Sequence, residues 1–267
     1  MTHPVSPHLP NSEAVRHTLR SRSCVLTRRN ASDAAFTRTL WADSVFMRSF
    51  HRLALALPVT NHELQRILNV EFQNPVAKSR ALHWTVKDPG GRPWGLLSLT
   101  DVSLLHKRAE VLLGVLPGAP FGLATAAMLM LFHFYFKTNK FNKLYSIVFA
   151  DNPHSLKGTL HLGFRQEGLL KGYTFDPHNQ TFVDVIHTGI HATEAFGQSN
   201  RRLMKKLLQD SPDKDRHLAQ SAGPTLSLAS EPPKFQPQPL TCREPRTHGN
   251  LYQHHRKQHL YRHDWCI

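Results

Sequence analysis

Residues 117–138 read PGAPFGLATAAMLMLFHFYFKT, a loop that runs directly into a long apolar segment. The first six residues contain two prolines, two glycines and no charge, which is typical of a loop. Residues 123–138 are apolar nearly all round, which predicts a helix buried on every side. Its first N–H groups, beside Gly122, form an anion site suited to a pyrophosphate. A simple loop-to-helix junction is the alternative.

Strand-like segments flank this loop and helix on both sides. Leu82, Trp84 and Val86 alternate with polar residues, and the turn signal of residues 88–91 separates them from the next segment. Further along, Asn152 is placed to cap a short helix. The order of elements predicts a mixed α/β fold. The expected strands are 24–29, 82–86, 94–100, 110–116, 143–149, 164–175 and 181–190, and the expected helices are 31–41, 60–68, 123–138 and 154–162.

The chain carries a formal net charge of +14, from 33 basic and 19 acidic residues. This balance favours polyanionic neighbours such as nucleic acid, the ribosome or an anionic membrane surface. Three cysteines make no disulfide framework, and the N-terminus has no apolar signal-peptide core, so we expect a cytoplasmic protein. The longest apolar run, residues 122–136, is too short to span a bilayer.

We expect three regions along the chain: a flexible N-terminus over 1–22, a folded domain over 23–197 and a basic tail over 198–267. The tail contains 12 basic and 6 acidic residues and is rich in proline and histidine, which predicts poor order. Within it, residues 199–209 (SNRRLMKKLLQ) have the pattern of a basic amphipathic helix. For the histidines near the C-terminus we favour a solvated basic tail over a metal site.

The motifs resemble those of the GCN5-related N-acetyltransferases, the GNAT superfamily. Residues 122–127 (GLATAA) are similar to the family's cofactor loop and helix start. About thirty residues later, Asn152-Pro153-His154-Ser155 and residues 162–168 (LGFRQEG) are similar to its "N-x-x-S … GF-x-x-EG" signature. Over residues 24–191 the resemblance implies a GNAT-like fold, in which a mostly antiparallel sheet of six to seven strands is flanked by helices.

Within that superfamily, the chain resembles the ribosomal-protein alanine acetyltransferases. A strand similar to residues 109–111 precedes the loop in that branch, and an Asp similar to Asp184 lies in the last strand. The resemblance implies acetyl-CoA as co-substrate, with its diphosphate at the loop and its pantetheine along the strand before it. Asn152 binds pantetheine or only caps its helix. The implied cofactor-binding residues are Leu113, Val115, Phe121, Gly122, Leu123, Ala124 and Asn152.

Acyl transfer to an amine needs a base that removes a proton from the attacking ammonium. Glu110 is our candidate base, because it begins the strand that the resemblance places beside the acetyl group. Asp101 and His106, in the preceding connection, are second choices. The alternative for Glu110 is a solvent-facing glutamate at a strand end.

The leaving thiolate of CoA has to be reprotonated. The resemblance places Ser155 near the sulfur, and Ser155 is our candidate acid. Many members carry a tyrosine at the place that Thr159 occupies here, and a threonine hydroxyl is a poor acid. The alternative for Ser155 is a role in helix capping alone.

We therefore expect an acetyl-CoA-dependent N-acetyltransferase whose acceptor is a primary amine, on a protein N-terminus or a small molecule. A polycationic acceptor is disfavoured, because no acidic cluster is visible in the sequence. One alternative is a non-catalytic GNAT-like adaptor, since Pro120 removes an N–H from the loop. Another is a ribosome- or nucleic-acid-binding module acting through the basic tail, including Arg201, Arg202, Lys205 and Lys206.

Overall fold

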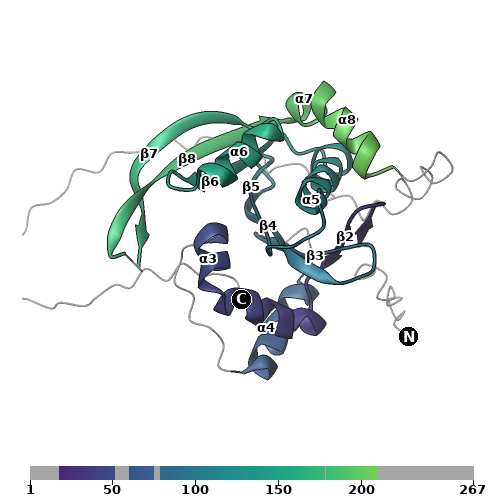
Figure 1. Cartoon of the computed structure of the whole chain (residues 1–267), viewed down its shortest axis with the longest axis vertical. Coiled ribbons are helices and arrows are strands. Elements are labelled where there is room, and N and C mark those ends of the chain that lie inside the picture. The colour runs from purple at the N-terminus through teal and green to yellow at the C-terminus, as the bar shows by residue number, and fades with distance from the viewer. Residues whose placement is uncertain (1–17, 52–59, 75–78, 178, 210–267) are drawn as a thin grey trace, which may run out of the picture.

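The computed structural model describes residues 18–51, 60–74, 79–177 and 179–209. In this part an eight-stranded sheet runs in the order β1-β2-β3-β4-β5-β6-β8-β7 (Figure 1). Neighbouring strands are antiparallel except β5 and β6, which run parallel. The strands are β1 (Leu19–Arg20), β2 (Val25–Arg28), β3 (Leu82–Lys87), β4 (Pro93–Ser103), β5 (Arg108–Val115), β6 (Lys143–Phe149), β7 (Arg165–Asp176) and β8 (Thr181–His191).

The expectation of a mixed α/β fold with a mostly antiparallel sheet is confirmed. All seven expected strands are present, and the eighth is the short β1, which pairs with β2. Two residues are too few to give a periodic signal, so β1 could not be read from the sequence. The expected basic tail beyond residue 209, with the histidines near the C-terminus, lies outside the described residues.

The expected helices differ from the structure mainly at their ends, and two short helices, over residues 44–50 and 192–195, were not expected. The helix expected over 31–41 begins with a 3₁₀ turn, in which the Asn30 side chain accepts the Ser32 N–H. The helix opened by Thr60 continues five residues beyond Leu68, to Gln73. The helices are η1 (Ala31–Asp33), α2 (Ala34–Ala42), α3 (Ser44–Phe50), α4 (Asn61–Gln73), α5 (Leu123–Phe132), η3 (His133–Thr138), α6 (Pro153–His161), α7 (Ala192–Ala195) and α8 (Gln198–Leu207).

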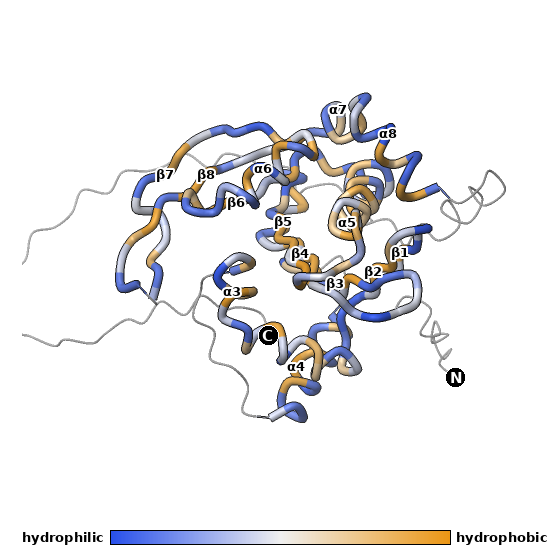
Figure 2. Tube along the Cα trace, viewed as in Figure 1, coloured by the Kyte–Doolittle hydropathy of each residue, from blue (hydrophilic) through white to orange (hydrophobic). Residues whose placement is uncertain are grey.

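Helix α5 is buried on both sides, and this explains its apolar sequence. Leu26, Trp84 and Leu97 of the sheet belong to the same core cluster as α5. On its other side α5 contacts α7 and α8, and Figure 2 shows its hydrophobic residues within this layer. The expected single helix ends its α-helical part at Phe132 and continues as the π-helix η3.

The opposite face of the sheet is covered by α2, α3 and α4. Helix α3 approaches β5 so closely that no side chain fits between them at Gly114. A Cβ on Gly114 would lie 2.9 Å from ring atoms of both Phe46 and Phe50. The two rings stack on each other with their centroids 5.3 Å apart. Glycine at position 114 therefore sets the position of α3 against the strand.

A buried ionic cluster joins α4 to β2 and β3. The Glu71 carboxylate accepts a 2.7 Å hydrogen bond from Arg29 Nη2, and the Glu71 carbonyl accepts one from Arg28 Nη2 at 3.3 Å. Burial lowers the pKa of His83 to about 3, so this neighbouring ring is neutral near pH 7. Burial alone would raise the pKa of Glu71, but Arg29 holds it below its usual value. The carboxylate is thus the anion that balances two buried arginines.

We expect Glu71→Gln to lower the free energy of unfolding by about 3–5 kcal/mol, because it leaves Arg29 buried without a counter-charge. Urea unfolding at pH 7 measures this loss. Since the folded pKa of Glu71 is depressed, its stabilising effect is present above the ordinary glutamate pKa and fades as pH falls below it.

The matched control is Glu63→Gln, which removes the same charge from the exposed face of α4. At the helix N-terminus that charge contributes about 0.3–1 kcal/mol. Equal effects of the two substitutions would contradict a structural role for the buried pair.

Candidate functional site

The central feature of the candidate site is the point where β5 and β6 part. Their parallel pairing is confined to residues 108–110 of β5 and 143–145 of β6. Both strands continue, β5 to Val115 and β6 to Phe149. A cleft of about 470 Å³ lies here, within the usual size range of ligand pockets. Its lining includes Phe46, Phe50, residues 111–115, Ala124, Thr125, Met128, Ser146, Ile147, Asn152, Ser155 and Thr159.

The β5 backbone offers hydrogen-bonding groups to this cleft. On one edge β5 pairs with β4 as far as Val115. On the other edge, within the described residues, its pairing with β6 stops at Glu110. The backbone N–H and C=O groups of residues 111–115 that point to this edge are therefore available to an extended ligand.

Glu110 lies where the two strands part. Its carboxylate accepts a 3.1 Å hydrogen bond from Thr100 Oγ1 on β4. It also lies near the backbone N–H of Ile147 on β6. Burial raises the pKa of Glu110, and the negative charge of Asp101 raises it further, while the Ile147 N–H partly offsets the rise. A half-buried carboxyl group with a raised pKa has the properties of a general base.

A polar cluster that sequence reasoning missed lies beside Glu110. The Tyr145 hydroxyl donates to Asp101 Oδ2 at 2.6 Å, and Arg108 Nη1 donates to the same oxygen at 2.5 Å. Burial alone would raise the pKa of Asp101, but these two hydrogen bonds lower it. Asp101, a second-choice base, is therefore committed to Arg108 and Tyr145 and is a poorer proton acceptor than Glu110.

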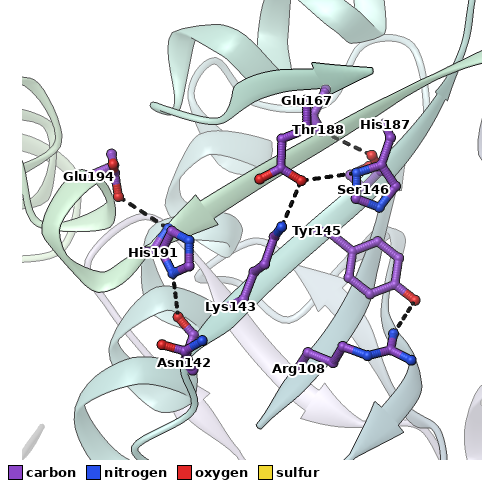
Figure 3. Close-up of polar contacts among 10 residues, drawn as sticks. All are labelled: Arg108, Asn142, Lys143, Tyr145, Ser146, Glu167, His187, Thr188, His191 and Glu194. Carbon is purple, nitrogen blue, oxygen red and sulfur yellow. Dashed lines mark hydrogen bonds and ion pairs between the residues drawn. The ribbon is translucent and has the colours of Figure 1, made fainter. Parts of the chain in front are cut away.

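This cluster continues onto the neighbouring strands. The ring of Tyr145 stacks on His187, with centroids 5.1 Å apart, and lies between His187 and Arg108 (Figure 3). Glu167 accepts hydrogen bonds from Lys143 Nζ at 2.7 Å and pairs with His187 Nδ1 at 3.1 Å. Only the alternating pattern of β6, which places Tyr145 level with Glu110, could have indicated this cluster from the sequence.

The loop before α5 has the expected backbone geometry at Gly122. This residue adopts a left-handed conformation with φ of 80°, where a residue with a side chain would be strained. No side chain caps the helix, and the first intrahelical bond runs from the Ala126 N–H to the Gly122 carbonyl. The N–H groups of Ala124 and Thr125 therefore have no carbonyl partner within the helix.

The predicted cofactor-binding residues divide into two groups. Leu113, Val115, Ala124 and Asn152 line the cleft. Phe121, Gly122 and Leu123 are not among its lining residues: Phe121 is 97% exposed and Leu123 is buried in the core. Their roles remain predictions.

Ser155, the candidate acid, lines the cleft together with Thr159. Asn152 Oδ1 accepts the Ser155 backbone N–H at 3.0 Å, so the capping role of Asn152 is present. Ser155 takes part in this cap through its backbone N–H and not through its hydroxyl group. The role of that hydroxyl remains a prediction.

Two other residues singled out in the sequence lie away from the cleft lining. His106 is exposed, and its backbone N–H donates to Ser103 Oγ at 3.2 Å. Asp184 Oδ1 accepts the Gly172 N–H at 2.7 Å and so supports the β7–β8 hairpin.

The described residues contain neither a metal-binding cluster nor a membrane-spanning helix. No group of three or more His, Cys, Asp or Glu residues is arranged to hold a metal ion. No helix in this part of the chain is long and apolar enough to cross a membrane.

Comparison with known proteins points to one family. A family model described as "Acetyltransferase (GNAT) domain" matches residues 24–165, more than half of the chain. No curated protein matches the sequence.

Among solved structures, the chain is similar to the spermidine N-acetyltransferase from Vibrio cholerae in complex with CoA and spermine. The TM-score is 0.57 at 20% identity, over 65% of this chain and 98% of that chain. It is also similar to the spermidine/spermine N-acetyltransferase SpeG from Vibrio cholerae in complex with manganese ions, with a TM-score of 0.52 at 20% identity over 64% and 94%. At this identity the likeness shows the fold.

We expect Asn152→Ala to lower the free energy of unfolding by about 1 kcal/mol, because it removes the cap of α6. Asn152→Asp retains an acceptor for the Ser155 N–H and is expected to stay close to the wild type. Thermal and urea unfolding measure both.

Ser155→Ala is the matched control, because it keeps the capped N–H and removes only the hydroxyl. We expect its free energy of unfolding to stay within about 0.5 kcal/mol of the wild type. A loss as large as that of Asn152→Ala would mean that the hydroxyl serves the fold.

Proposed function

The chain belongs to the GNAT acetyltransferases, acetyl-CoA-dependent N-acetyltransferases, and on that premise we propose that it transfers the acetyl group to a primary amine by direct attack in a ternary complex. The observation that carries the proposal is the position of Glu110, a carboxyl group with a raised pKa at the point where β5 and β6 part. Glu110 is not itself a lining residue, but it adjoins Val111, where the lining of the cleft begins on β5, and this position supports its role as the base.

The residues present fit acetyl-CoA. The free edge of β5 at residues 111–115 matches the extended, amide-containing pantetheine arm. The unpaired N–H groups of Ala124 and Thr125, at the positive end of α5, suit the diphosphate. Bound acetyl-CoA supplies the thioester carbonyl that the amine attacks.

Glu110 removes the proton that the attacking ammonium has to lose. Its raised pKa brings the carboxylate closer to the pKa of the amine and so favours proton transfer near neutral pH. Glu110 takes this proton before the attack and leaves a neutral amine. As the nitrogen–carbon bond forms and the carbon–sulfur bond breaks, the Ser155 hydroxyl at the cleft wall gives its proton to the departing sulfur and takes the second proton of the nitrogen. Glu110 then returns its proton to water.

The strand backbone stabilises the charge that develops on the carbonyl oxygen. Backbone N–H groups at Leu113 and Val115 lie on a strand held in place by β4, so they are fixed before the reaction begins. The proposed roles are thus Glu110 as base, Ser155 as acid and the β5 backbone as oxyanion donor.

The acceptor surface favours an amine with one positive charge. Asp101 pairs with Arg108, and Glu167 pairs with Lys143, so these two carboxylates beside the site are already balanced by cations. A protein N-terminus, as in the ribosomal-protein alanine acetyltransferase branch, or a small monoamine suits this surface. The similar solved structures include spermidine N-acetyltransferases, which makes a polyamine the competing acceptor.

We expect Glu110→Gln to lower kcat/KM by about 10²–10⁴-fold, the usual contribution of a general base. The wild-type rate falls as pH drops through the raised pKa of Glu110, and this acidic limb disappears in the variant. Steady-state kinetics over a pH series measure both effects.

The control is Asp101→Asn, which removes a carboxylate that is already paired with Arg108. Because burial and the Asp101 charge both raise the pKa of Glu110, we expect this variant, which loses the charge, to keep an acidic limb and to move it to lower pH. Titration with CoA verifies that each variant still binds the cofactor. A Glu110→Gln enzyme with wild-type rates and an unchanged pH profile would refute the assignment.

We expect the enzyme to acetylate an alanine-initiated peptide with a kcat/KM at least equal to that for spermidine, because the neighbouring carboxylates are neutralised. A thiol-release assay with both acceptors, and with the same peptide blocked at its N-terminus, measures this ratio. A preference for spermidine of tenfold or more would show that the acceptor is a polyamine.

A further inference from the structure

Helix α8 lies outside the region matched by the family model, yet it contacts the loop before α5. Leu207 Cδ2 lies 3.2 Å from the position that a Cβ on Gly122 would occupy. The helix is anchored by the buried Asn200, whose Nδ2 donates to the Leu162 carbonyl at 2.8 Å and to the Ala195 carbonyl at 3.2 Å. Its C-terminal turn therefore has a fixed position beside the proposed diphosphate loop.

The loop itself adds no side-chain cation to the backbone N–H groups that suit the diphosphate. Residues 117–122 contain no lysine, arginine or histidine, and Pro120 has no N–H to donate. The acetyl-CoA nucleotide carries a diphosphate and a 3′-phosphate. Helix α8, over residues 198–207, contains four basic residues and no acidic one. It is thus a nearby source of side-chain positive charge.

The helical rotation distinguishes the two lysines next to Leu207. At about 100° per residue, Lys206 is turned about 100° from Leu207, whereas Lys205 is turned about 160° away. Leu203 and Leu207 both pack against the core, so they mark the core-facing side of α8. Lys206 comes three residues after Leu203 and is turned about 60° from it. Both lysines are exposed, and neither has an ion pair within the described residues. By this rotation Lys206 lies on the side of α8 nearer to Leu207, and Lys205 lies on the far side.

We propose that Lys206 binds a phosphate group of the acetyl-CoA nucleotide, so that α8 completes a cofactor site whose loop has no cation of its own. The inference rests on the proposed function. The flexible lysine stem and its compact ammonium group suit a phosphate as a point charge beside the backbone N–H groups. Arg202 lies about one turn earlier on α8 and adds a further positive charge to this helix.

The test is calorimetric titration of the full chain with CoA and with 3′-dephospho-CoA, using the wild type, Lys206→Gln and Lys205→Gln. We expect Lys206→Gln to weaken CoA binding by about threefold to tenfold, as for a partly exposed charge-assisted contact. We expect Lys205→Gln, which removes the same charge one residue away, to change the Kd by less than about twofold.

The two ligands identify the phosphate. An effect of Lys206→Gln on CoA alone assigns the contact to the 3′-phosphate, and an equal effect on both ligands assigns it to the diphosphate; either result supports the inference. Equal effects of the two lysine variants, or no effect of Lys206→Gln, would overturn it. Failure of the wild type to bind CoA would overturn the proposed function itself.

Discussion

The end of the parallel pairing between β5 and β6 is the constraint on which the proposed site depends. A continued ladder would use the backbone groups of both strands and leave no space between them. Instead the pairing ends at Glu110 and Tyr145, and the Glu110 carboxylate lies near the Ile147 N–H, which partly offsets the rise in its pKa that burial causes. The candidate base thus stands at the position where the strands part.

The layers on either side of the sheet keep this opening in place. The rings of Phe46 and Phe50 on α3 pack against Gly114. Gly114 lies on β5 after Glu110, the last β5 residue that pairs with β6. On the other face α5 is enclosed between the sheet and the C-terminal helices α7 and α8. The cleft therefore lies between α3 and α5, and each helix is fixed by its own packing. Such support is needed for a site whose polar groups are in position before the ligand binds.

The sequence allowed most of the fold to be predicted and a smaller part of the site. Local patterns identify the strands and most helices, because alternation and capping act over a few residues, as at Leu82–Val86 and Thr60. The family resemblance brought Leu113, Val115, Ala124, Asn152 and Ser155 together, and all five line the cleft. Contacts between distant segments gave no local signal: the Arg29–Glu71 pair, the Tyr145–Asp101 hydrogen bond and the contact of Leu207 with Gly122 depend on the tertiary structure.

The position of Glu110 links the width of the cleft to the pKa of the base. Its carboxylate is held by Thr100 on β4, while the Ile147 N–H on β6, on the other side of β5, partly offsets the rise in its pKa that burial causes. A ligand that widens the space between β5 and β6 moves this N–H away from the carboxylate. Filling the cleft would then raise the pKa of Glu110 further and make it a stronger base.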